Sequence, residues 1–160
     1  MTQITLYPPL VTDFDRQVRA RAHATHMSIC IAAGKRFSKY MKVCIGPWVT
    51  SFHDSDRQVS RAAIESFEKV FDSEKKRDIV WDKYGGSILK YISDVLTNET
   101  AKTISRPWVM MGLILGDGTF MSAEDMDARF SLVAGMCLST LAKMACIVFL
   151  KSLVADCKCL

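Results

Sequence analysis

The chain has 160 residues, which suits one domain with a sizeable core and leaves no room for two full domains. Hydrophobic residues make up 49% and charged residues 24%, a balance that excludes an intrinsically disordered chain. The net charge of +4 is uneven, because residues 1–44 hold seven basic and two acidic residues, a net charge of +5. This basic third indicates either a solvated helix face or a surface for an acidic partner such as RNA.

The cysteines lack the spacing of a metal site. None of the six forms a CxxC pair, and no histidine stands at zinc-finger distance from them. Most lie in apolar periodic segments, where a free cysteine behaves as a small hydrophobic residue. The first residues, Met1 to Tyr7, lack the basic start and apolar run of a secretory signal, so we expect a protein of the reducing cytosol.

A short motif occurs twice. Asp13-Phe14-Asp15-Arg16-Gln17-Val18 recurs as Asp54-Ser55-Asp56-Arg57-Gln58-Val59, with five of six residues identical at an offset of 41 residues. HEAT and armadillo units have periods of about 40–47 residues. In each copy we expect an Asp to cap the incoming helix, the Val to begin its buried stripe, and the Arg to bridge to a carboxylate of the neighbouring repeat.

Apolar residues at steps of three and four predict four helices after these motifs. The first stripe, capped by Thr12 or Asp13 and ended by Gly34, consists of Val11, Phe14, Val18, Ala22, Thr25, Ile29 and Ala32. The second spans Phe37–Phe52, and we expect Gly46-Pro47 to kink or split it. The third, capped by Asp54 or Ser55, spans Val59–Phe71; a polar turn at 72–78 then leads to the fourth, Ile79–Leu96.

The predicted fold is therefore all-α, a HEAT/armadillo-like helical-repeat solenoid. Residues 6–104 would form two HEAT-like helix pairs, 105–120 an irregular apolar insert, and 121–156 a long helix or the start of a further repeat. Within the insert, the run Trp108–Leu115 reads as a short buried strand or an apolar loop.

Two features of the carboxy-terminal part raise the alternative of a membrane-attached protein. The first is the apolar stretch Leu132–Leu150, where the central Lys143 disfavours a transmembrane span. The second is Cys157-Lys158-Cys159-Leu160, which has the length of a prenylation signal but a Cys where an aliphatic residue is usual. The sequence thus disfavours a membrane protein and predicts a monomer.

Several blocks in order resemble the amino-terminal part of listerin, and the fungal members most closely. These are the Asp-x-Asp-Arg turn, Gly46-Pro47-Trp48, Phe67–Phe71 with Ser73–Arg77, Tyr91–Leu96, and Ser122–Phe130. The resemblance covers residues 6–104 and 121–143. It implies an arm of a RING-type E3 ubiquitin ligase that binds large ribosomal subunits carrying stalled nascent chains, together with a partner factor. The ubiquitin-conjugating enzyme and zinc would belong to the RING domain, of which this sequence has no Cys/His series.

The resemblance leaves catalysis outside this chain, and we predict no catalytic, cofactor-binding or metal-binding residue in it. The alternative function is a HEAT adaptor in transport or trafficking. For contact with ribosomal RNA the candidates are Lys35, Arg36, Lys39 and Lys42, of which the three lysines stand at i, i+4 and i+7, on one face of an α-helix. The alternative for this face is simple solvation.

Overall fold

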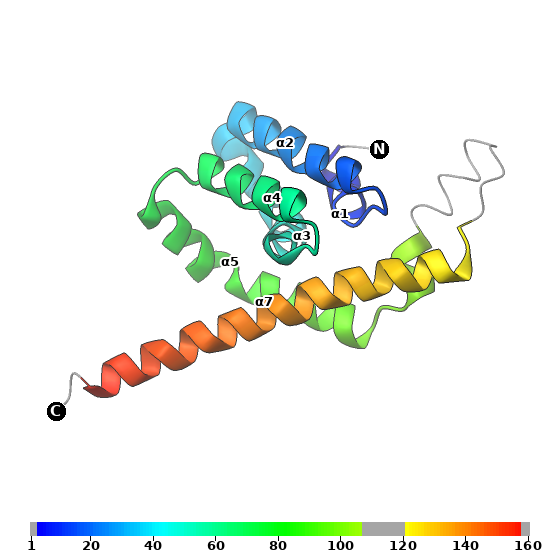
Figure 1. Ribbon diagram of the computed structural model, residues 1–160. Coiled ribbons are helices and arrows are strands. Elements are labelled where there is room, and N and C mark those ends of the chain that lie inside the picture. The colour runs from blue at the N-terminus through cyan, green and yellow to red at the C-terminus, as the bar shows by residue number, and fades with distance from the viewer. Residues whose placement is uncertain (1–2, 107–120, 158–160) are drawn as a thin grey trace.

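The computed structural model describes residues 3–106 and 121–157, with side chains over 6–106 and 121–146 (Figure 1). Those residues form helices joined by short turns and contain no strand, so the predicted all-α class is confirmed. The helices are α1 (Gln3–Leu10), α2 (Arg16–Ala33), the 3-10 helix η1 (Gly34–Tyr40), α3 (Met41–Thr50), the 3-10 helix η2 (Ser51–His53), α4 (Arg57–Val70), α5 (Glu74–Thr97) and α7 (Ala123–Cys157).

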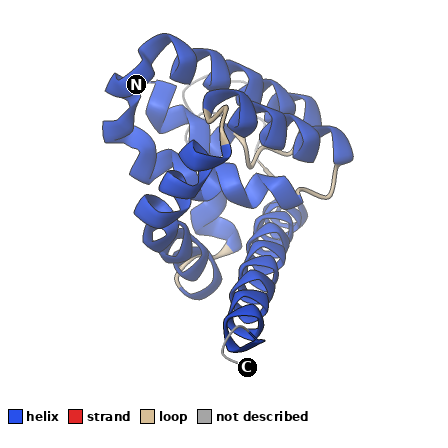
Figure 2. Cartoon of the chain, turned by 90° about the vertical axis from the view of Figure 1, so that its left-hand side faces the viewer, coloured by secondary structure: helices blue, strands red, loops and turns tan. Residues whose placement is uncertain are grey.

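The body of the molecule has two layers of helices. α2 packs on α4 in one layer and α3 packs on α5 in the other, so each repeat places one helix in each layer. α2 and α4 run side by side in the same direction, and α5 returns antiparallel to α4 (Figure 1). The long helix α7 contacts α5, α3 and η2, and its carboxy-terminal end extends past the other helices (Figures 1 and 2).

The buried face of α2 differs from the predicted apolar stripe. Of that stripe, Phe14 is 61% exposed and Thr25 and Ala32 are exposed. The buried positions of α2 follow the same helical period but are largely polar: Arg19, Ala22, His23, His26 and Cys30. The prediction was right for Val11 and Ala22, which are buried, and wrong for the exposed positions. It counted only apolar residues, whereas hydrogen bonds inside the fold let Arg19 and His23 face the core.

The second predicted helix is divided at another place than expected. Gly34 ends α2 with a positive φ of 53°, as predicted, but the chain continues as the 3-10 helix η1 before α3 begins at Met41. The expected split at Gly46-Pro47 was wrong, because α3 runs through both residues.

The polar stretch 72–78 is a turn only as far as Ser73, whose side chain caps α5 at its first turn.

Trp48 lies at the centre of the core. It is fully buried, and its ring meets those of His26 and Phe67 edge-on, with centroid distances of 4.5 and 5.5 Å. Its indole Nε1–H donates to the Ser66 hydroxyl at 2.8 Å, which supplies the hydrogen bond that a buried tryptophan needs. One side chain of α3 thereby joins α2 and α4 across the two layers.

Candidate interaction surface

The two copies of the repeated motif adopt the same turn. In each copy the first Asp (Asp13 or Asp54) accepts a hydrogen bond from the backbone N–H of the second Asp, at 2.7 and 2.8 Å. The second Asp (Asp15 or Asp56) caps the helix by accepting from the backbone N–H two residues later, again at 2.7 and 2.8 Å. The capping role therefore belongs to the second Asp of each motif, one to three positions after the residues that the helical pattern suggested.

The bridge expected of the motif arginine is present in the first copy, whereas Arg57 of the second copy makes no ion pair within the described residues. Arg16 Nη1 of the first copy donates to Asp56 Oδ2 of the second copy at 3.2 Å. The Arg16 side chain is 66% exposed, so solvent screens the pair and its contribution to stability is small.

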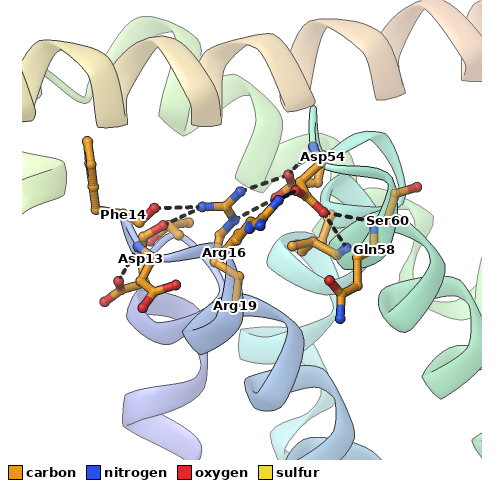
Figure 3. Close-up of polar contacts among 12 residues, drawn as sticks. Asp13, Phe14, Arg16, Arg19, Asp54, Gln58 and Ser60 are labelled. Carbon is orange, nitrogen blue, oxygen red and sulfur yellow. Dashed lines mark hydrogen bonds and ion pairs between the residues drawn. The ribbon is translucent and has the colours of Figure 1, made fainter.

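A stronger link, which the sequence analysis missed, is made by Arg19. Its Nε and Nη2 donate to the two carboxylate oxygens of Asp54 at 2.8 and 3.0 Å, while its Nη1 donates to the carbonyl oxygens of Asp13 and Phe14 (Figure 3). The side chains of Arg19 and Asp54 are only 6% and 0% exposed. We call these four residues the inter-repeat clamp, because they tie the turn of one copy to the turn of the other.

The sequence contains only a weak signal for this clamp. Arg19 lies just beyond the shared motif, and the equivalent residue 41 positions later is Ser60, so the repeat itself did not mark it. The available signal is that Arg19, His23 and His26 fall on one face of a helix. Three polar residues on one face indicate that this face holds buried polar groups.

The long helix α7 brings a further cation to the clamp. Arg129 is 2% exposed, and its burial lowers its pKa to about 10, with the carboxylate of Asp13 acting against that shift and the guanidinium of Arg19 adding to it. The start of α7, just after Ser122, therefore lies against the turns of the two motifs. It is 110 residues or more later in the chain than Asp13.

The four basic candidates lie on the surface. Lys35, Arg36 and Lys39 belong to η1 and Lys42 to α3, and all four are exposed. Lys39 Nζ sits 4.7 Å from the centre of the Tyr40 ring, a cation–π contact. The i, i+4, i+7 argument for a single face was wrong, because a 3-10 helix turns every three residues and the change to α-helix falls between Lys39 and Lys42.

Two histidines of α2, His23 and His26, are buried in the core. The rings of Tyr7 and His26 stack at 3.7 Å, and the Tyr7 hydroxyl lies 3.2 Å from Nδ1 of His23. Within the described residues, Nε2 of neither histidine has a hydrogen-bond partner. Burial lowers the pKa of His23 to about 3, with further lowering from His26 and Arg19, and burial lowers that of His26 to about 4.

These histidines predict a loss of stability in mild acid. Their folded-state pKa values lie below the unfolded value of about 6.5, so the unfolded chain binds more protons. Above about pH 6.5 both histidines are neutral in the folded and unfolded chain, and the free energy of unfolding has its full value. Below that pH each histidine lowers the free energy of unfolding by about 1.4 kcal/mol per pH unit, until the pH approaches 4. Urea unfolding at a series of pH values measures this slope. His26→Phe, which keeps a stacking ring, should remove one histidine's share, and an unchanged slope would contradict the prediction.

Among the described residues, no three His, Cys, Asp or Glu side chains gather as metal ligands would. Over the same part of the chain, no helix has the length and apolar character needed to cross a bilayer. The apolar run Trp108–Leu115 and the last three residues of the prenylation-like ending, 158–160, lie outside the described residues.

Comparison with known proteins gives a consistent family. Residues 3–154 match the family model described as the N-terminal domain of E3 ubiquitin-protein ligase listerin. Curated listerins are similar to the chain: 32% identical over 81% of it in Neurospora crassa, 31% over 86% in Schizosaccharomyces pombe, and 26% over 87% in Gallus gallus. The matched stretch is 7–8% of each of these relatives.

Proposed function

Because the chain belongs to the listerin family and corresponds to its N-terminal domain, we propose that it is a scaffold segment of a ubiquitin ligase of ribosome-associated quality control. In this role it contacts the large ribosomal subunit that carries a stalled nascent chain, and a partner factor beside it. The ligase ubiquitinates the stalled chain in the cytosol. Its zinc-binding RING domain, which receives the ubiquitin-conjugating enzyme, lies in a part of the protein beyond the segment matched here.

The inter-repeat clamp is the observation that carries the scaffold role. A bidentate, buried pair between Arg19 and Asp54 holds two stacked helix pairs in one relative orientation. A contact surface built on linked helices keeps its shape while a large partner binds, so less conformational entropy is lost on association. The exposed basic residues of η1 and α3 are displayed by this rigid body.

The basic residues are proposed to contact ribosomal RNA, and charge reversal tests this. In the full-length ligase, changing Lys35, Lys39 and Lys42 together to Glu should abolish most binding to large subunits, because three phosphate contacts become repulsive. It should also flatten the dependence of log affinity on log salt by about one for each lost contact. Co-sedimentation with purified large subunits at several salt concentrations measures both quantities.

A second triple variant controls for charge alone. Lys75, Lys90 and Lys102 are exposed and belong to α5 and the helical residues 101–106, not to η1 or α3. Changing these three to Glu alters the net charge equally and should leave binding and salt slope near those of the parent protein. Equal losses in both triple variants, or none in either, would contradict a specific contact at η1 and α3.

A further inference from the structure

A groove opens where the two repeats meet, at the end where α2 passes into η1 and α4 passes into α5. Its volume is about 780 Å³, which is in the range of sites that hold a sizeable ligand. One wall comes from Ile31 to Met41 and the other from Lys69 to Tyr84. The turn between α4 and α5 lies on the left of the picture in Figure 1, above the projecting end of α7, and this side faces the viewer in Figure 2. We call it the repeat-junction groove.

Apolar side chains are exposed on both walls. Ile31 at the end of α2 is 58% exposed, and Ile79 in the second turn of α5 is 54% exposed. Between them Phe37, Met41 and Val80 are buried and form an apolar floor. Large side chains exposed on facing walls over a continuous apolar floor are typical of a surface that a partner covers.

The charged residues of the groove are nearly all cationic. Its lining contains four lysines and one carboxylate, that of Asp72. Lys69 pairs with Glu65 at 2.7 Å and Lys76 with Asp72 at 2.8 Å. Within the described residues, Lys35 on one wall and Lys83 on the other have no carboxylate within 4.0 Å. These two lysines belong to opposite walls of the groove, and Lys83 Nζ lies 5.4 Å from the centre of the Tyr84 ring.

From this arrangement we propose that the repeat-junction groove binds an acidic amphipathic helix of a partner protein. The apolar side chains of this helix cover Ile31, Ile79 and the floor, and carboxylates on its two flanks pair with Lys83 and with Lys35, for which the helix therefore competes with ribosomal RNA. This is the helix-in-groove mode of recognition. The lining favours a protein segment over RNA because most of it is apolar and two of its four lysines are already neutralised by neighbouring carboxylates.

A designed peptide tests the groove with the full 160-residue chain. The probe is a labelled amphipathic helix several turns long, with leucines three and four residues apart and glutamates on the flanks. A scrambled peptide of the same composition, a peptide with lysines in place of the glutamates, and a single-stranded RNA oligonucleotide serve as comparisons. Fluorescence polarisation gives the affinity for each.

Matched variants on α5 localise the binding. Ile79→Glu and Lys83→Glu should each weaken binding of the acidic peptide by roughly 10-fold or more. Leu89→Glu and Lys75→Glu place the same changes at exposed positions of α5 outside the groove and should leave affinity unchanged. Circular dichroism confirms that each variant keeps the helical fold of the parent.

The outcomes are distinct. Preference for the acidic amphipathic peptide, lost in the groove variants alone, supports the proposal. It is overturned by equal binding of the scrambled peptide, by equal losses in the control variants, by absence of binding, or by a groove that binds RNA and not the acidic peptide. This proposal rests on the scaffold function and adds a partner to it. The two proposals can fail independently, because peptide binding is measured without ribosomes and the Lys35, Lys39 and Lys42 variant is measured with them.

Discussion

Asp54→Ala is expected to destabilise the fold by about 3–5 kcal/mol, because the substitution leaves the Arg19 guanidinium buried without its counter-charge. For a chain of this length that corresponds to a fall in melting temperature of roughly 10 °C. Urea unfolding followed by circular dichroism measures the free energy. The same change also removes the acceptor for the Asp56 backbone N–H, which loosens the turn before α4.

The repeat supplies a matched control at Asp13. This residue holds the same place in the first motif and accepts the same backbone hydrogen bond, but its carboxylate makes no bidentate pair with Arg19. Asp13→Ala removes this hydrogen bond, worth about 1 kcal/mol, and also the carboxylate that favours the charged form of the buried Arg129, so its cost should exceed about 1 kcal/mol but stay below that of Asp54→Ala. Replacing both charged residues of the buried pair, as Arg19→Met together with Asp54→Leu, should lower the free energy of unfolding by less than the sum of the two single changes. Similar losses for Asp13→Ala and Asp54→Ala would contradict the special role of the buried pair.

Gly46→Ala is expected to cost about 3 kcal/mol or more, although alanine is the better helix former. A Cβ at position 46 would lie 2.5 Å from both Cβ and Cγ of Tyr91 and 2.8 Å from its Cδ1. The Cβ of Tyr91 is fixed to the backbone of α5, so rotating the side chain does not relieve the overlap and α3 must move away from α5. Thermal unfolding of the variant measures the loss.

Gly86→Ala is the control for Gly46→Ala. Gly86 lies inside α5, and a Cβ there meets nothing within 4 Å. Alanine should stabilise this site by roughly 0.5–1 kcal/mol through helix propensity and a less disordered unfolded state. Opposite signs for the two substitutions are the expected result. A stabilising Gly46→Ala would mean that α3 and α5 do not approach as closely as Gly46 and Tyr91 indicate.

The sequence predicted the class of the fold well because the repeat is a property of neighbouring residues. The 41-residue offset and the steps of three and four depend on local helix geometry, and the observed α2, α4 and α5 lie close to where those patterns put helices. It missed α1, because Pro8 and Pro9 argue against a helix when read alone. It also misjudged Gly46, which reads as a helix breaker and in fact permits close packing on Tyr91.

The interactions of the candidate site were less predictable because they join residues far apart in the chain. Arg19 and Asp54 are 35 residues apart, and neither Arg19 nor the face it shares with His23 and His26 looks like a core position by hydrophobicity. The four basic candidates are all exposed, while the nearby apolar residues Phe37 and Cys44 are buried. Whether these four contact RNA stays a prediction. The repeat-junction groove needs the tertiary fold, because its walls come from separate repeats.

The position of the clamp also has a consequence for how the domain opens. In a linear array of repeats, cooperativity depends on how much of the stabilisation lies between units and how much within them. The Arg19–Asp54 pair is entirely between units, and it joins the starts of α2 and α4. Neither helix can then unravel from that end without exposing a buried charge on the other. Amide protons of α2 and α4 should therefore exchange with solvent through one shared opening, with equal protection free energies. In the Asp54→Ala variant the two helices should open independently, with two different protection free energies.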